Sequence, residues 1–373
     1  GGVGETPGPR AEIVPTTPSR PAPPSDRDLD RMVDMFSAAK RPVIAVGLSA
    51  VRADVGERIA QAAERHAVPV VLTPMAKGLL SEDHRSYAGV LLHALSDRVA
   101  ETYANADLVV GVGYDPVEFN YEEWMPEVAL VHIDTEPADI DTRTYGPVCN
   151  VVGDIEVALT RLIGIDPIES AWDLDESSAR RNEIFATLSP ENGSFGPLAV
   201  LSILREILPD DGIMACDVGA HTHLIGQAWR TPWRFGQIMT NGWSSMGFGV
   251  PAAIAAKIAE PKRAVVCVTG DGGFMMMAGE MATVKRLGLP VVFVVLKDRA
   301  LGLIRIKQNK RGKHTDDTLL CNGEVCPTGH QFGVPVLTAT DCDSYRSALE
   351  QAFASAGPTI VEAEITITEY ESA

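Results

Sequence analysis

The sequence predicts an α/β protein with two doubly wound domains, in each of which helices cover both faces of a mainly parallel sheet. Two patterns support this fold class. Apolar runs too short for helices alternate along the chain with helix-like stretches, and these runs are almost continuously apolar, which is typical of strands buried on both faces. The chain is also long enough for two cores, since it has 373 residues of which 45% are hydrophobic.

Residues 1–27 are rich in Pro, Gly, Ser and Thr and have no apolar periodicity, so they are expected to form an extended linker. The first domain is predicted over residues 28–165, where an initial helix leads into a short apolar run closed by Gly47. In chain order, the expected elements are a helix at 28–40, a strand at 41–47, a helix at 57–67, a strand at 68–73, a helix at 97–106, strands at 107–113 and 128–134, and a helix at 154–164.

A polar, irregular segment at residues 166–195, with a helical piece at 175–188, is predicted to separate the domains. The second domain is predicted over residues 196–373, and its apolar runs repeat the pattern of the first. Its expected elements are a helix at 197–208, a strand at 212–219, a helix at 244–260, a strand at 263–272, a helix at about 277–287, and strands at 289–298 and 359–365.

The composition excludes several classes of function. The 32 basic and 50 acidic residues give a formal net charge of −18, which repels nucleic acids and anionic membranes. No run approaches the roughly 18 apolar residues of a membrane helix, and the N-terminus has no signal pattern. We therefore expect a cytoplasmic protein without nucleic-acid or membrane partners. The six cysteines are sparse, and Cys216 and Cys267 lie in apolar runs, so no disulfide framework is expected.

Cys321, Cys326 and His330 are close enough in sequence to suggest a metal site. A fourth ligand is missing, however, and the spacing matches no zinc pattern well. An ordinary loop is therefore the favoured interpretation.

Residues 264–307 are the most informative segment. A buried strand ends in Gly-Asp-Gly-Gly at 270–273, a helix follows, and a second strand ends at Asp298. Carboxylates at the ends of neighbouring parallel strands lie where open α/β sheets bind ligands, and hard oxygen ligands suit Mg²⁺. The glycines let backbone N–H groups approach a phosphate at the N-terminus of the following helix. The segment thus predicts a site for a Mg²⁺-bound diphosphate, although an isolated Gly-Asp-Gly is more often a tight turn.

The spacing of the two carboxylates resembles the signature of thiamine-diphosphate enzymes, in which an Asn or Asp follows 27 positions after the Asp of Gly-Asp-Gly. Asp271 and Asp298 are 27 positions apart. The resemblance implies that both side chains bind Mg²⁺ and that the backbone carbonyl of Ala300 is a third protein ligand. The family commonly has Asn-Asn or Asn-Asp at this strand end, whereas Lys297 and Arg299 flank the aspartate here.

Residues 216–229 and 241–258 are similar to stretches of acetolactate synthases that cradle the diphosphate and hold the cofactor bent. Met246 matches the bulky residue that wedges between the two cofactor rings, a role that suits a flexible, polarizable side chain. The alternatives are a methionine packed in the core, and ordinary surface histidines at His221 and His223. The resemblance implies cofactor contacts from Gly219, Ala220, His221, Thr222, Ser244, Met246, Gly270, Gly272 and Gly273.

Residues 28–165 resemble the central domain of acetolactate synthases. The sequence GYDPVEFN at 113–120 is closer to the flavin-independent, catabolic branch than to the branch that retains FAD, so FAD is left open but not favoured. Strand ends at Gly47, Gly113 and Asp134 could hold a nucleotide. No G-x-G-x-x-G supports one, and a scaffold that shapes the active-site entrance is the favoured role.

Thiamine-diphosphate catalysis needs a carboxylate beside the aminopyrimidine ring. In the family that the chain resembles, this glutamate belongs to a separate pyrimidine-binding domain and acts across a subunit interface. Glu5 and Glu12 lie in the linker, and Glu280 matches a structural position. We therefore expect a second chain that carries the activating domain, with a shortened polypeptide as the trivial alternative.

The resemblance further implies a dimer or tetramer that decarboxylates a 2-oxo acid, pyruvate, and joins the product to an acceptor carbonyl. A decarboxylase without carboligation and a non-catalytic cofactor-binding subunit are the alternatives. The segment after Asp298 departs from the family. Its basic residues could meet an anionic substrate, but a solvated basic loop is favoured; they are Lys307, Lys310, Arg311 and Lys313.

Overall fold

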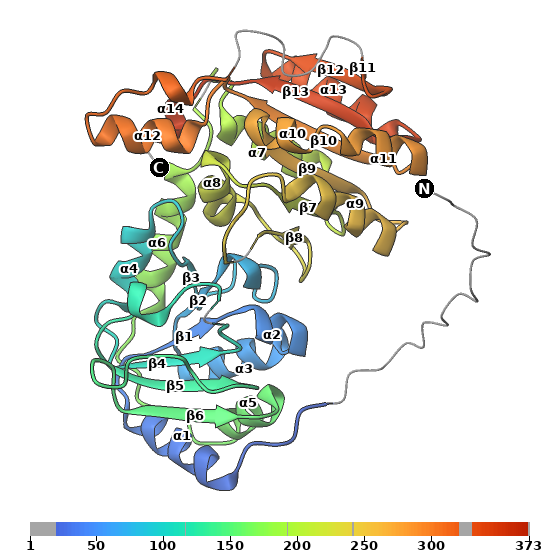
Figure 1. Cartoon of the computed structure of the whole chain (residues 1–373). Helices are drawn as coiled ribbons and strands as arrows, with labels where there is room; N and C mark the ends of the chain where they lie inside the picture. Colours follow the sequence, from blue (N-terminus) through green and yellow to red (C-terminus); the bar gives the residue numbers. More distant parts are fainter. Residues whose placement is uncertain (1–19, 116, 192, 241, 321–329, 372–373) are drawn as a thin grey trace, which may run out of the picture.

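The computed structural model describes residues 20–371 except 116, 192, 241 and 321–329, and it contains two α/β domains (Figure 1). The elements of the first domain, in chain order, are α1 (Asp26–Ala38), β1 (Pro42–Val46), α2 (Leu48–Ala53), α3 (Gly56–His66), β2 (Val70–Leu72), the 3-10 helix η1 (Pro74–Ala76), β3 (Tyr87–Val90), α4 (Ser96–Tyr103), β4 (Leu108–Val112), η2 (Tyr121–Glu123), β5 (Ala129–Asp134), β6 (Val148–Val152) and α5 (Ile155–Ile163).

A helix connects this domain to the second one. From there the elements are α6 (Leu174–Thr187), α7 (Pro197–Ile207), β7 (Ile213–Cys216), α8 (Ala220–Ala228), β8 (Gln237–Ile238), α9 (Gly249–Ala259), β9 (Val265–Gly270), α10 (Asp271–Met277), α11 (Glu280–Leu287), β10 (Val291–Lys297), α12 (Gly302–Lys310), η3 (Asp316–Thr318), β11 (His330–Gln331), β12 (Val334–Ala339), α13 (Cys342–Ala354), β13 (Thr359–Glu364) and α14 (Thr368–Glu371).

Both sheets are parallel in nearly all of their pairings. The described strands of the first sheet run in the order β3-β2-β1-β4-β5-β6, and every pair is parallel. The second sheet has the order β11-β12-β13-β10-β9-β7-β8, in which β11 alone among the described strands is antiparallel to its neighbour. The predicted fold class is confirmed.

Each sheet is buried on both faces, as its continuous apolar strands predicted. In β1, Val43 and Ala45 join one hydrophobic cluster while Ile44 and Val46 join another on the opposite face. Successive side chains of a strand point to opposite faces, so both faces need helical cover. In the second sheet, α9, α10 and α11 cover one face, and α7 and α13 cover the other.

Several expected helix boundaries differ from the observed ones; the helix expected at 244–260, for example, begins only at Gly249. Helix α1 begins two residues before the expected domain start, because the Ser25 side chain accepts a hydrogen bond from the Asp28 N–H and caps it there. The single helix expected at about 277–287 is two helices, and α10 begins directly at Asp271. The Gly-Asp-Gly-Gly sequence is therefore not a free loop, since its last three residues form the first turn of α10.

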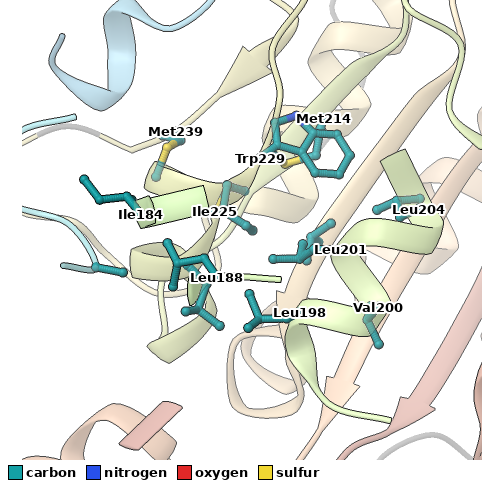
Figure 2. Close-up of a cluster of buried hydrophobic side chains, with 14 of the residues drawn as sticks. Ile184, Leu188, Leu198, Val200, Leu201, Leu204, Met214, Ile225, Trp229 and Met239 are labelled. Atoms are coloured by element: carbon teal, nitrogen blue, oxygen red, sulfur yellow. The ribbon is translucent and has the colours of Figure 1, made fainter. Parts of the chain in front are cut away.

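The segment at 166–195 contains a helix close to the piece expected at 175–188, but part of the segment is buried between the domains rather than polar. The helix is the 14-residue α6. Figure 2 shows Ile184 of α6 and Leu188 beside Leu198 and Leu201 of α7 and Ile225 of α8, in one continuous buried cluster. The connecting helix therefore contributes to the core of the second domain.

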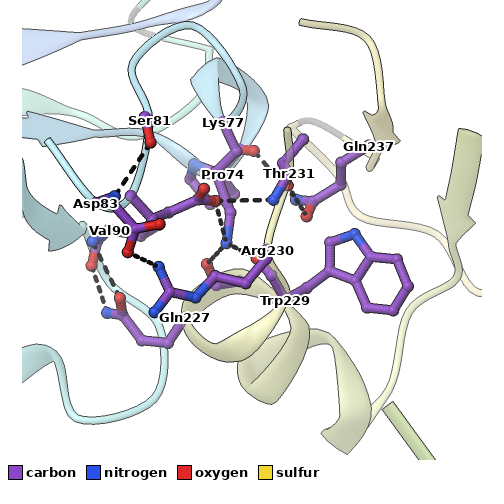
Figure 3. Close-up of polar contacts among 12 residues, drawn as sticks. Pro74, Lys77, Ser81, Asp83, Val90, Gln227, Trp229, Arg230, Thr231 and Gln237 are labelled. Atoms are coloured by element: carbon purple, nitrogen blue, oxygen red, sulfur yellow. Dashed lines mark hydrogen bonds and ion pairs between the residues drawn. The ribbon is translucent and has the colours of Figure 1, made fainter. Parts of the chain in front are cut away.

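A polar network joins the first domain to α8 of the second (Figure 3). The Lys77 ammonium donates to the carbonyls of Gly226, at 3.0 Å, and Trp229, and it lies 3.5 Å from a Glu82 carboxylate oxygen. A buried cation thus satisfies the last carbonyls of α8, where the helix dipole favours positive charge. The Gln227 side chain bonds both the N–H and the carbonyl of Val90 in β3. The first domain therefore fixes α8 from its C-terminal end.

No helix in the described part of the chain is long and apolar enough to cross a membrane. The four cysteines that the structure describes, Cys149, Cys216, Cys267 and Cys342, are free thiols. Cys216 and Cys267 are buried in strands, as their apolar sequence surroundings suggested.

Candidate cofactor site

The carboxyl ends of β7, β9 and β10 border a cavity of about 230 Å³ at one edge of the second sheet. Because β9 and β10 pair in parallel, with Leu296 opposite Gly270, the residues that follow the two strands come together. Thr222 and Ser244 line a neighbouring cavity of about 200 Å³ instead. The other residues implied by the sequence all line the first cavity: Gly219, Ala220, His221, Met246, Gly270, Asp271, Gly272, Gly273, Asp298 and Ala300.

Asp271 and Asp298 are two mutually unfavourable carboxylates in this cavity. Asp271 accepts hydrogen bonds from the N–H groups of Gly272, at 2.8 Å, and Arg299, at 2.7 Å, and Asp298 accepts one from Ala300 at 3.0 Å. Burial raises the pKa of Asp271, and burial together with the Asp271 charge raises the pKa of Asp298 to about 7. A divalent cation would offset both charges, and carboxylate oxygens are the ligands that Mg²⁺ prefers.

Two glycines keep the cavity open to backbone groups. A Cβ at Gly272 would lie 3.0 Å from Leu301 Cδ2 and 3.3 Å from Met246 Cε. A Cβ at Gly302 would lie 2.7 Å from a carboxylate oxygen of Asp298. A larger residue at either position would crowd the Asp298 carboxylate or the Met246 side chain, so the site requires glycine at both.

His221 has a ring nitrogen without a partner. Its side chain is 2% exposed, and Nε2 makes no hydrogen bond to any described residue. Burial lowers the pKa of His221 to about 4, although the nearby Asp217 carboxylate acts in the opposite direction. His221 is therefore not a surface histidine, and its free nitrogen in the cavity wall is a polar group that a ligand could satisfy.

Met246 lies at the tip of a turn beside the cavity and is half-buried, so it is not an ordinary core methionine. The turn includes left-handed residues on either side of it, Ser244 with φ of 48° and Gly247 with φ of 88°. Trp243, at the start of the same turn, is 98% exposed. The turn thus places Met246 at the cavity and Trp243 in solvent, and neither side chain packs in the core.

The two cations that flank Asp298 are neutralised by the neighbouring strand β13. The Lys297 ammonium lies 2.7 Å from Glu362, and both side chains are buried. Arg299 pairs with Glu364 at 2.8 Å. The departure from the usual Asn-Asn or Asn-Asp sequence is therefore accompanied by two glutamates on β13 that pair with the two cations.

The basic segment after Asp298 is partly helical rather than a loop, but the four cations noted in the sequence are exposed, as the favoured interpretation predicted. Lys307 and Lys310 belong to α12 and line a cavity of about 600 Å³ between the domains, together with His93 and His223. Arg311 and Lys313 are exposed beyond the helix end. This larger cavity adjoins the first one, since Ala220, Leu303 and Tyr370 line both.

Of the three residues of the alternative metal site, Cys321, Cys326 and His330, the structure describes only His330. Cys321 and Cys326 lie outside the described residues, and His330 is exposed at the start of β11. Within the described residues, no group of three or more His, Cys, Asp or Glu side chains is arranged to hold a metal. A metal at Asp271 and Asp298 would therefore need backbone, phosphate or water oxygens to complete its ligands.

The first sheet has the strand order that often binds nucleotides, with the order reversing between β1 and β4. That crevice is filled by the side chain of Glu118. Its carboxylate accepts hydrogen bonds from the Leu48 N–H, at 2.6 Å, and from the Thr73 hydroxyl. A Cβ at Gly47 would lie 2.5 Å from Glu118 Oε1. The glycine after β1 therefore accommodates the chain's own carboxylate.

Sequence reasoning assigned no role to Tyr370, which lines the cavity, or to Asp217, which lies behind it. Tyr370 of α14 lines both large cavities although it is near the end of the sequence. Asp217 is fully buried directly behind the cavity and accepts hydrogen bonds from Thr269, Gly247 and Gly249. Its position at the end of the strand expected at 212–219 was the available signal.

Together, the fold and the site define an α/β protein with a carboxylate-containing cavity at the carboxyl edge of a parallel sheet, a place suited to a metal-bound anionic cofactor. Two family models match the chain. The thiamine pyrophosphate enzyme central domain matches residues 29–162, and the thiamine pyrophosphate enzyme C-terminal TPP binding domain matches residues 217–363. The chain belongs to the thiamine pyrophosphate (thiamine diphosphate) enzymes.

Relatives with known names extend the match to most of the chain. It is 30% identical to the acetolactate synthase large subunit of Parasynechococcus marenigrum over 95% of its own length and 58% of that protein. It is 26% identical to the acetolactate synthase of Bacillus subtilis over 92% and 62% of the two lengths, and equally similar to a putative thiamine pyrophosphate-containing protein of that organism over 92% and 60%. The chain thus spans about three fifths of the length of these relatives.

Proposed function

We propose that this chain binds thiamine diphosphate and Mg²⁺ in the cavity of the second domain. With them it would decarboxylate a 2-oxo acid, pyruvate, and join the product to an acceptor carbonyl as in acetolactate formation. The observation that carries the proposal is the meeting of Asp271, Asp298 and the unpartnered His221 nitrogen in one cavity. The names of the relatives support the reaction type.

The residues of the cavity fit the two groups. Asp271, Asp298 and the carbonyl of Ala300 would bind Mg²⁺. Backbone N–H groups of 219–222 and 270–273 would bind the diphosphate, apart from those of Gly219, Thr222 and Gly272, which already donate within the chain. Met246 would pack against the cofactor rings. Thiamine diphosphate supplies the electron sink for loss of CO₂. The chain itself would orient the cofactor and exclude water with the apolar lining of Leu296, Leu301 and Ile304.

The activating glutamate would come from a domain outside the sequence printed here, on the same polypeptide or on a second one. Glu280, the nearest glutamate to the motif in sequence, begins α11 and does not line the cavity. Large apolar side chains are exposed on the segments that line the cavity, namely Trp243, Met275, Met276 and Ile304, of which Ile304 lines it directly. A surface of this kind favours burial against another domain, which supports an active site completed at an interface.

We also propose that the reaction uses no flavin. The crevice between β1 and β4, where a dinucleotide would bind, holds the Glu118 carboxylate against the first turn of α2. An anionic pyrophosphate brought to this place would meet a fixed carboxylate and lose the Leu48 N–H as a donor. The sequence at 113–120 that suggested flavin independence thus contains the residue that fills the crevice.

Native and denaturing mass spectrometry of the protein purified from its source would test the proposal, combined with cofactor release and a pyruvate assay on the same sample. We expect bound thiamine diphosphate with Mg²⁺, a pyrimidine-binding domain in the complex, and acetolactate as product. Acetaldehyde in place of acetolactate would favour the decarboxylase without carboligation. Bound cofactor with no pyruvate consumption would favour a non-catalytic cofactor-binding subunit, and absence of cofactor binding would refute the proposal.

A further inference from the structure

Asp217 is a buried carboxylate that connects the three sequence segments of the cofactor cavity. It follows β7, is 0% exposed, and does not itself line the cavity. Its Oδ2 accepts hydrogen bonds from the Thr269 hydroxyl, at 2.7 Å, and the Gly247 N–H, at 3.2 Å. Its Oδ1 accepts one from the Gly249 N–H at 3.3 Å. A single side chain therefore joins the ends of β7 and β9 to the turn that carries Met246.

The backbone of Asp217 extends the same connection to the predicted diphosphate loop. Its carbonyl accepts a hydrogen bond from the Thr222 hydroxyl at 2.8 Å, and that hydroxyl in turn accepts one from the Gly219 N–H at 2.9 Å. Thr222 lines the neighbouring cavity rather than the first one, and this bond gives it a role in holding the loop. Asp217 is thus bonded to every segment that the sequence assigned to the cofactor.

The glycines around Asp217 make room for it. A Cβ at Gly273 would lie 2.2 Å from Asp217 Oδ2, and a Cβ at Gly249 would lie 2.8 Å from Asp217 Cβ. Both glycines line the cavity, but Gly273, the last residue of the Gly-Asp-Gly-Gly sequence, also accommodates a side chain of the protein, whereas a Cβ at Gly272 would meet Leu301 and Met246. Two glycines of one motif are therefore required for different reasons.

The turn at Met246 needs such an anchor. Ser244 and Gly247 are both left-handed, and Trp243 and Ser244 are exposed, so few contacts hold the turn from its outer side. The two N–H bonds to Asp217 come from Gly247 and Gly249, immediately after Met246. They fix the backbone that sets where the methionine side chain lies.

We propose that Asp217 is a positioning residue that sets the Met246 turn against the bound cofactor. The inference rests on the proposed function, since it assumes that thiamine diphosphate occupies the cavity. An asparagine cannot replace the carboxylate, because its NH₂ group would face the N–H of Gly247 in one orientation and that of Gly249 in the other. The role therefore depends on two acceptor oxygens rather than on size.

Titration calorimetry on the intact protein, with its partner if one copurifies, separates this role from general stability. The probes are thiamine diphosphate and inorganic pyrophosphate, each with Mg²⁺. We expect Asp217→Asn to weaken thiamine diphosphate binding about tenfold, the effect of losing hydrogen bonds to a charged group, and to change pyrophosphate binding less than about twofold. Met246→Ala should show the same selectivity, and the double variant should be no weaker than Met246→Ala alone.

Asp341→Asn is the matched control, because Asp341 is an exposed carboxylate of the same domain that caps α13 through the Ser344 N–H. It should leave both affinities unchanged. If Asp217→Asn does not fold, Thr269→Val removes one of the three donors and should weaken only thiamine diphosphate binding, about threefold. Equal loss of both probes, or additive effects with Met246→Ala, would overturn the inference. If the wild-type protein binds neither probe, the proposed function itself fails.

Discussion

Both sheets are mainly parallel and covered by helices on both faces, but the carboxyl edge of the second sheet is open and that of the first sheet is closed. In the second sheet, the residues after β9 and β10 leave a cavity with two carboxylates and an unpartnered histidine nitrogen. In the first sheet, the crevice after β1 and β4 is closed by Glu118, which bonds the first residue of α2. Both edges end in glycines and acidic residues, so neither residue type alone distinguishes a ligand site from a closed crevice.

The contacts around the glycines explain the difference. A Cβ at Gly113 would lie 2.0 Å from the backbone nitrogen of Ala50, and one at Gly47 would meet Glu118. These glycines allow the chain to pack on itself. At Gly272 the nearest atoms are the flexible ends of Leu301 and Met246 across the cavity. A strand-end glycine therefore indicates a ligand site only when the space beside it is not already filled by the protein.

The largest predicted effect is a loss of cofactor binding on changing a carboxylate at the open edge of the second sheet. Asp271→Asn removes one of the two charged ligands proposed for Mg²⁺, and we expect Mg²⁺-dependent binding of thiamine diphosphate to weaken about a thousandfold, or roughly 4 kcal/mol. The cofactor-free protein should unfold at the same temperature or higher, because the Asp271 charge is one cause of the raised pKa of Asp298. Calorimetric titration and thermal unfolding measure the two effects.

The closed edge provides the contrast for that experiment. Glu118→Gln changes a buried carboxylate at the equivalent edge of the other sheet. Glu118 borders the neighbouring cavity with Thr222 and Ser244 but does not line the cavity of Asp271 and Asp298, so cofactor affinity should stay within about twofold of wild type, a difference of less than about 0.5 kcal/mol. Comparable losses in the two variants would show that the edges are not functionally different and would remove the basis of the comparison.

The next effect concerns the connection between the two regions. Lys77→Met removes the buried cation that bonds the last carbonyls of α8 and pairs with Glu82, and we expect a loss of about 3 kcal/mol in the free energy of unfolding. Denaturant unfolding followed by tryptophan fluorescence measures it. Lys262 is exposed, so Lys262→Met should change stability by less than about 0.5 kcal/mol. Equal, small effects would mean that α8 is held without the first domain.

The sequence allowed the fold class and the main cavity to be predicted because both depend on local patterns. Continuous apolar runs identified the buried strands, and the spacing of Asp271 and Asp298 placed two carboxylates at the ends of neighbouring strands. The role of Asp217 could not be predicted in this way. Its partners Gly247 and Gly249 lie 30 and 32 positions away and meet it only through tertiary packing.

The surroundings of Asp298 at the end of β10, and the packing of α6, were likewise not predictable from the sequence. Lys297 and Arg299 looked unfavourable beside a metal site, but the register of β10 with β13 brings Glu362 and Glu364 to them. Likewise, α6 was expected in a polar separator, yet its last turn is in the core because Ile184 and Leu188 face α7 and α8. Long-range register, which a single sequence does not specify, decided both.

The smallest effect should be a pH dependence from the closed edge. Burial raises the pKa of Glu118 from 4.5 to about 7 in the folded protein. Between these values the folded protein holds a proton that the unfolded chain releases, so this contribution to stability is complete below about pH 4.5 and is lost as the pH rises through about 7. Since one pKa unit corresponds to about 1.4 kcal/mol, the whole change is at most about 3.5 kcal/mol, of which about 2.5 kcal/mol falls between pH 5 and pH 8.

Glu118→Gln should remove this contribution, because an amide resembles the protonated acid: its oxygen can accept from the Leu48 N–H while its NH₂ donates to the Thr73 hydroxyl. Urea unfolding of both proteins from pH 5 to pH 8 measures the difference. Asp298 has a raised pKa and titrates with the same sign in both proteins, so only the difference between them reports on Glu118. Parallel pH profiles would mean that the crevice admits enough water to keep the carboxylate ionised, and the first sheet would then be less closed than its contacts indicate.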